Sequence, residues 1–99
     1  MAPRGKKVFA IADKFKRLRT TKKTYNQQGQ IYFTCINYAR QPEAVRKKID
    51  RLCESVGGEF APALKEFLTT SRSYISVCDR HYISTTRLDR LRTKFYDEW

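Results

Sequence analysis

Apolar side chains recur at helical intervals between residues 74 and 95, and this pattern is the most informative one in the chain. The apolar positions are Val77, Cys78, Ile83, Leu88 and Leu91. Their spacing predicts two short helices that meet at a tight turn. We expect Val77 and Leu88 to be buried between the helices and Ile83 to fill the turn. Ser84 directly precedes the second helix, where its hydroxyl is expected to act as the N-cap.

Three earlier segments, residues 8–19, 42–56 and 62–68, also carry apolar residues at helical spacing. The middle segment gives the clearest helical pattern. Pro42 suits its first helical position, and the Gly57–Gly58 pair ends it. The last of the three segments is expected to bury Ala61, Leu64, Phe67 and Leu68.

One further segment, residues 25–40, fits two patterns. Its apolar residues alternate near the centre as they would in a strand, whereas the spacing of Tyr32, Ile36 and Ala39 fits one face of a helix. No second segment is suited to pair with a strand here, and an isolated strand is unstable. We therefore predict a helix from about Gln30 to Ala39.

Positive charge is concentrated at the amino end. The chain carries a formal net charge of +11, and residues 1–24 contribute +8 of it, from nine Lys or Arg against Asp13. A compact domain with such an excess repels itself, and a bound polyanion offsets this repulsion while counterions are released. DNA, RNA, a ribosome surface and anionic lipid all meet this condition, so the charge indicates a class of partner and no more.

The residues around the predicted turn are ordered as a small residue, a turn residue, an aliphatic residue and a serine, namely Cys78, Tyr82, Ile83 and Ser84. This order resembles the helix-turn-helix of bacterial and phage transcription regulators. Residues 37–99 as a whole are also similar to small regulators of phages and mobile elements. The resemblance implies a DNA-binding transcription regulator of such an element. The chain departs from the usual motif at Tyr82, because the family usually has a glycine there and tyrosine disfavours a positive φ.

Polar residues on the second predicted helix suit contact with double-stranded DNA. Short hydroxyl side chains and a flexible cation are typical of a helix that lies in the major groove. We expect base contacts from Thr85, Thr86, Asp89 and Arg90. We expect contacts with the phosphate backbone from Arg4, Lys6, Lys7, Lys14, Arg17, Lys22, Lys23, Arg87, Arg92 and Lys94.

The predicted fold is all-α, a small bundle of four to six helices with a C-terminal helix-turn-helix at about residues 74–95 and a basic N-terminal arm. A chain of 99 residues is long enough for one domain and too short for two independent cores. Residues 1–24 are expected to form the basic arm and a first amphipathic helix, and residues 25–99 the helical domain. The connections between the segments are short, which favours helices packed around one core.

The sequence argues against an enzyme, a metal-binding protein and a membrane protein. His81 is the single histidine, and Asp79 lies two positions away, so a helix would direct the two side chains apart. Cys35, Cys53 and Cys78 each lie on the apolar face of a predicted helix, where a thiol behaves as a small hydrophobic group. We therefore predict no enzyme activity, no metal and no cofactor. No apolar run has the length of a membrane span and no secretory signal is visible, so we expect a cytoplasmic protein without a membrane partner.

Two other functions remain open. A small basic interaction protein could inhibit a host nucleic-acid enzyme, with Tyr96 and Trp99 either exposed as anchors or closing the core. Tyr25, Tyr32 and Phe33 could instead stack on the bases of a single strand, although helical placement favours a core role. A homodimer on a two-fold DNA site is reasonable, but no heptad seam indicates one. The operator sequence and the direction of regulation do not follow from the sequence.

Overall fold

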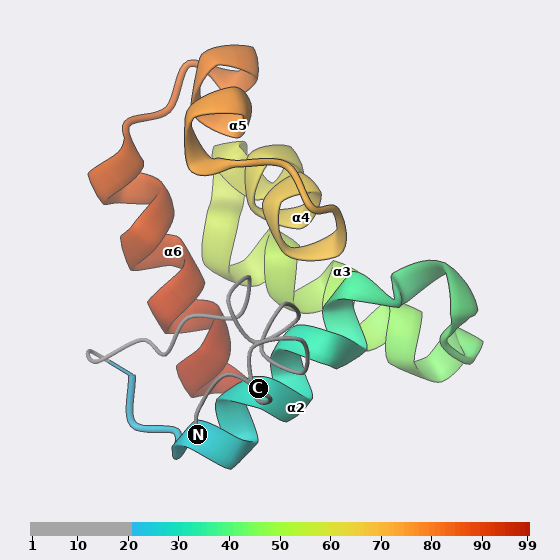
Figure 1. Cartoon of the computed structure of the whole chain (residues 1–99). Coiled ribbons are helices and arrows are strands. Elements are labelled where there is room, and N and C mark those ends of the chain that lie inside the picture. The colour runs from blue at the N-terminus through green and yellow to red at the C-terminus, as the bar shows by residue number, and fades with distance from the viewer. Residues whose placement is uncertain (1–20) are drawn as a thin grey trace, which may run out of the picture.

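The computed structural model describes residues 21–99, and this part of the chain is all-helical, with no β-strand (Figure 1). The all-α prediction is thus confirmed for these residues. The predicted arm and the predicted helix at residues 8–19 lie outside the described range. The α-helices are α2 Tyr25–Ile36, α3 Glu43–Gly57, α4 Ala61–Thr69, α5 Tyr74–His81 and α6 Thr85–Glu98. Two short 3-10 helices, η1 Tyr38–Arg40 and η2 Gly58–Phe60, flank α3.

Helix α2 confirms the choice of helix over strand, but the predicted bounds Gln30–Ala39 are wrong at both ends. The helix begins earlier because Thr24 and Gln27 form a capping box. The Thr24 hydroxyl accepts from the Gln27 amide at 3.2 Å, and the Gln27 side chain accepts from the Thr24 amide at 2.9 Å. It ends earlier because the Asn37 side chain donates to the Phe33 carbonyl oxygen at 2.8 Å and the chain then tightens into η1.

Helix α3 forms where the apolar pattern of residues 42–56 predicts a helix, but it begins one residue later than predicted. Pro42 is the N-cap, so that Glu43 rather than Pro42 is the first helical residue. Gly58 ends the helix at a φ of 55°, a value that glycine adopts without steric cost. Helix α4 extends one residue beyond the predicted range 62–68 at each end. Leu64 and Leu68 are buried as predicted, whereas Ala61 and Phe67 are only partly buried and Ala63 is buried instead.

The core consists of two groups of buried side chains that meet at α4 and α6. The larger group joins α2, α3, α4 and α6 through Ile31, Cys35, Ile49, Cys53, Val56, Leu64, Leu68, Phe95 and Tyr96. The smaller group lies under the α5–α6 hairpin and consists of Ala63, Val77, Ile83 and Leu88. Leu91 packs against both groups, so the hairpin is continuous with the main core. Full burial of each large aliphatic side chain contributes about 1.5–3 kcal/mol.

The aromatic residues at the end of α6 are part of this core. Tyr96 is 2% exposed, and the rings of Phe95 and Trp99 lie 5.8 Å apart between centroids. The Lys48 ammonium group lies over the Trp99 ring, 4.0 Å from its centre, in a cation–π contact. An exposed-anchor role for Tyr96 is therefore wrong, and the alternative that these residues close the core is confirmed.

Candidate nucleic-acid interface

The α5–α6 hairpin has the packing that its sequence pattern predicts. Val77 and Leu88 are 0% exposed, and Ile83 in the turn is 5% exposed. Ser73 caps α5 by accepting from the Ser76 amide at 3.2 Å. Ser84 caps α6 by accepting from the Arg87 amide at 3.1 Å. Both helices therefore start at fixed points, and α6 is held rigidly against the core by its apolar face (Figure 1).

Tyr82 takes the turn conformation that a glycine would normally supply. Its φ and ψ are 54° and 46°, in the left-handed region, and it is the one non-glycine residue of positive φ among residues 21–99. Its amide donates to the Cys78 carbonyl oxygen, and so does the amide of Ile83, at 3.2 Å. The side chain is 93% exposed. Tyr82 thus bears a backbone strain of about 1–2 kcal/mol.

One face of α6 presents a group of exposed polar side chains that the sequence had predicted for DNA contact. They are Thr86, Arg87, Arg90 and Lys94, and Thr85 is exposed in the first turn of the same helix. Arg87, Arg90 and Lys94 follow each other at three and four residues and therefore lie on the same side of the helix. Within residues 21–99, Arg90 and Lys94 form no ion pair, and Arg87 lies over the Phe60 ring at 5.4 Å. This group is called the α6 polar face below.

Asp89 is not part of the α6 polar face. It accepts a hydrogen bond from the Tyr74 hydroxyl at 2.8 Å, and its carboxylate lies 3.4 Å from the Arg92 guanidinium. These bonds direct the side chain toward the start of α5. Burial of the ring raises the pKa of Tyr74, and the hydrogen bond to Asp89 raises it further, whereas the charge of Arg92 lowers it.

Arg92 is likewise directed away from the α6 polar face. Its side chain is 16% exposed, and its guanidinium lies 5.4 Å from the centre of the Phe67 ring and 5.1 Å from that of Tyr74. Stacking on aromatic rings suits the planar guanidinium group. The structure therefore places Arg92 in the interior between α4, α5 and α6, apart from Arg87 and Lys94.

The residues just before α2 are attached to the far end of α6. The Lys22 backbone amide donates to the Asp97 carboxylate at 2.8 Å, and the Thr21 hydroxyl donates to the same oxygen. These two hydrogen bonds, with the Thr21 bond the larger cause, lower the pKa of Asp97. Lys22 and Lys23 thus lie near the C-terminal end of the helix that carries the α6 polar face. The other predicted arm residues, Arg4, Lys6, Lys7, Lys14 and Arg17, lie outside the described part of the chain.

A carboxylate that sequence reasoning missed fixes α5 on α4. Glu66 of α4 contacts His81 at 2.8 Å, Arg80 at 3.1 Å and Arg72 at 3.2 Å. The hydrogen bond with His81 is the main cause of the lowered pKa of Glu66, followed by the nearby arginines. No local pattern could show this cluster, because His81 is fifteen residues from Glu66 in the chain. His81 therefore has a structural partner.

The cysteines behave as buried apolar groups. Cys35 and Cys53 are each 1% exposed, and burial raises the pKa of both thiols to about 12, so they stay protonated at neutral pH. Cys78 is partly buried, and its pKa is raised for the same reason. Among residues 21–99 no three side chains of metal-binding type come together.

No protein-family model, curated protein or solved structure matches this chain. None of the helices within residues 21–99 has both the length and the apolar character needed to cross a bilayer.

Proposed function

We propose that the protein binds double-stranded DNA in a sequence-specific way through α6 and acts as a transcription regulator of a phage or mobile element. The α6 polar face carries this proposal. The Thr86 hydroxyl and the cations Arg90 and Lys94, which form no ion pair within residues 21–99, lie on one side of a helix whose opposite side, at Leu88 and Phe95, is fully buried. A rigid helix with such a face suits insertion into the major groove, where side chains can reach base edges.

The exposed side chains divide into two roles under this proposal. Thr86 and Arg90, which lie four residues apart on this face, contact base edges, together with Thr85, which is exposed in the first turn of α6. Arg87 and Lys94 contact phosphates on either side of the groove. Asp89 is left out of the base-reading set, since Tyr74 and Arg92 already engage its carboxylate. Arg92 is left out of the phosphate set because its guanidinium is largely buried.

The distribution of charge supports a polyanion as partner for the folded part as well as for the arm. Residues 21–99 contain fourteen Lys or Arg against nine Asp or Glu, a net +5, and residues 1–20 contain seven against one, a net +6. The two parts sum to the +11 of the whole chain. A protein with this balance gains affinity for any nucleic acid from counterion release, and the α6 polar face would add the sequence preference.

The test is selection from a pool of random duplexes, followed by sequencing of the retained DNA, with the intact protein and two variants. Arg90→Ala is expected to abolish or relax an enriched motif and to weaken binding to it by about 1–3 kcal/mol. Arg40→Ala is the matched control, because Arg40 is also exposed but lies on η1. The control should keep the motif.

The outcome distinguishes this function from the two others that the sequence leaves open. If no motif is enriched, while salt-sensitive binding to duplexes and single strands is equally tight, the protein is a nonspecific binder and the α6 polar face reads no bases. If affinity for every free nucleic acid is weak, the inhibitor of a nucleic-acid enzyme becomes the better explanation. An equal loss on all sequences for Arg90→Ala would assign Arg90 to the phosphates.

A further inference from the structure

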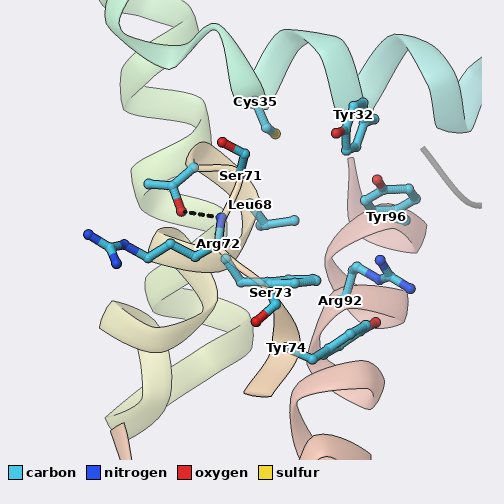
Figure 2. A pocket seen from close by; sticks show the side chains of 11 residues that line it. Tyr32, Cys35, Leu68, Ser71, Arg72, Ser73, Tyr74, Arg92 and Tyr96 are labelled. Carbon is cyan, nitrogen blue, oxygen red and sulfur yellow. Dashed lines mark hydrogen bonds between the residues drawn. The ribbon is translucent and has the colours of Figure 1, made fainter. Parts of the chain in front are cut away.

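A cavity of about 400 Å³ lies between α2, α4, α6 and the segment that joins α4 to α5. In Figure 2, Tyr32 and Cys35 of α2 lie on one side of it, Tyr96 and Arg92 of α6 on another, and Ser71 of the connecting segment opposite. The volume falls in the range of sites that bind small molecules. None of the residues assigned to DNA contact in the α6 polar face lines it, so its role is separate from that surface.

Arg92 gives the cavity its charged group. Its Nε atom is buried and has no hydrogen-bond partner within residues 21–99. Its one ion pair there, with Asp89, is long at 3.4 Å, and the acceptor oxygen already receives the Tyr74 hydroxyl at 2.8 Å. A buried donor without an acceptor is unfavourable, so the environment of this guanidinium is incompletely satisfied. Its terminal N–H groups, of which one contacts Asp89 within residues 21–99, retain the capacity to bind a further acceptor, because the side chain is still 16% exposed.

Tyr96 supplies a second donor beside Arg92. Its ring is buried, and burial raises the pKa of the phenol, so the hydroxyl stays protonated and can donate at any physiological pH. One part of the wall is apolar, with Phe67, Leu68 and Cys35 lining the same space, and the segment 70–73 adds hydroxyl groups and Arg72. An occupant must therefore combine a single anionic acceptor group with an apolar body.

We propose that this cavity binds a small organic monocarboxylate. The carboxylate is held by the Arg92 guanidinium and the Tyr96 hydroxyl, and the aromatic or branched aliphatic body packs against Phe67, Leu68 and Cys35. The planar fork of arginine matches the two oxygens of a carboxylate. A phosphate group fits less well, because both cations that line the cavity already have acidic partners: Arg92 pairs with Asp89 and Arg72 with Glu66. The proposal does not depend on DNA binding by α6.

The test is a titration of the isotope-labelled full-length protein, followed by NMR, with 2-naphthoate and 4-methylpentanoate and with the primary amides of both acids. We expect at least one of the acids to produce saturable shifts at the amides of residues 70–74 and 92–96. Each bound acid should bind about tenfold or more tightly than its amide, which has the same shape without the charge. Arg92→Gln should reduce the affinity for the acid to that for the amide. Arg87→Gln, which removes a cation of α6 outside the cavity, should leave it unchanged.

A second variant tests the cavity without removing the buried guanidinium. Ser71 is exposed and lines the cavity, so Ser71→Phe should obstruct the cavity while the dispersion of the spectrum remains that of the folded protein. We expect it to weaken the binding of acids and amides together. The proposal is overturned if neither acid gives saturable shifts at millimolar concentration, if acid and amide bind equally well, or if a bound acid is unaffected by Ser71→Phe.

Discussion

Tyr82 combines an exposed side chain with a backbone conformation that disfavours any residue with a Cβ atom. Because the ring is 93% exposed, the side chain contributes little packing that could compensate for the strain. The turn is nevertheless well bonded, since the amides of Tyr82 and Ile83 both reach the Cys78 carbonyl oxygen. The strain is therefore a property of this one residue and should be removable without a change in the fold.

We predict that Tyr82→Gly raises the free energy of unfolding by about 1 kcal/mol, because glycine relieves the strain but loses more chain entropy on folding. Chemical denaturation measures the change. Tyr82→Ala is the matched control, since it removes the same ring but keeps the Cβ atom, and its stability should stay near that of the parent. A glycine variant less stable than the alanine variant would show that Tyr82 is not strained.

At the scale of the element, α6 depends on Ser84 for its start. The Ser84 hydroxyl satisfies the Arg87 amide at 3.1 Å, on the same turn that begins the α6 polar face. Ser84→Ala should lower the free energy of unfolding by about 1 kcal/mol. Ser55 is exposed within α3 and caps no helix, so Ser55→Ala is the control and should change stability little. Equal thermal midpoints for the two variants would argue against the cap.

Helix α5 depends on a carboxylate from another element. Glu66 has a folded-state pKa below its ordinary 4.5, caused first by the hydrogen bond with His81. A lowered carboxyl pKa stabilises the fold fully above the unfolded-state pKa, and this contribution is lost as the pH falls through the lower folded-state pKa. The attachment of α5 to α4 should therefore weaken in acid, starting below about pH 4.5.

We predict that Glu66→Gln lowers the free energy of unfolding at pH 7 by about 1–3 kcal/mol, because His81, Arg80 and Arg72 lose a charged partner. The difference in stability from the parent protein should shrink as the pH is lowered below 4.5, because the Glu66 carboxylate of the parent then becomes protonated and loses its charge. Denaturant titrations at several pH values measure this. Glu54→Gln is the control, since Glu54 is exposed on α3. A difference that is constant with pH would mean that the charge of Glu66 is not what matters.

At the scale of the whole molecule, the basic amino end and α6 are joined through Asp97. The hydrogen bonds from Thr21 and Lys22 attach the start of the described chain to the C-terminal end of α6. The basic residues 1–20 directly precede this attachment point in the chain, close to the end of the proposed DNA-binding helix. Under the proposed function, the arm contributes general affinity for phosphates, and the α6 polar face contributes sequence preference.

We predict that combined replacement of Lys6, Lys7, Lys14 and Arg17 by glutamine weakens DNA binding and reduces the slope of log affinity against log salt by up to about 4. The enriched DNA motif should remain the same. Binding to one duplex over a salt series measures the slope, and selection measures the motif. A changed motif would show that the arm reads bases, and an unchanged slope would show that these residues do not contact phosphates.

The sequence determined the helices and their buried faces, because these depend on residues within about four positions of each other. The cap at Ser84, the burial of Val77 and Leu88, and the glycine stop of α3 were all readable in this way. The early start of α2 also has a local signal, the Thr24–Gln27 capping box, and its early end has one in Asn37.

The tertiary structure alone decided which polar side chains are engaged and which stay free. Asp89 and Arg90 are adjacent charged residues on the polar part of the α6 pattern. Tyr74 donates a hydrogen bond to Asp89, whereas Arg90 forms no ion pair within residues 21–99. The Glu66 cluster, the burial of Tyr96 and the cavity beside Arg92 likewise join residues far apart in the chain. Periodicity gives the direction of a side chain relative to its own helix, but its partners are set only when the helices pack together.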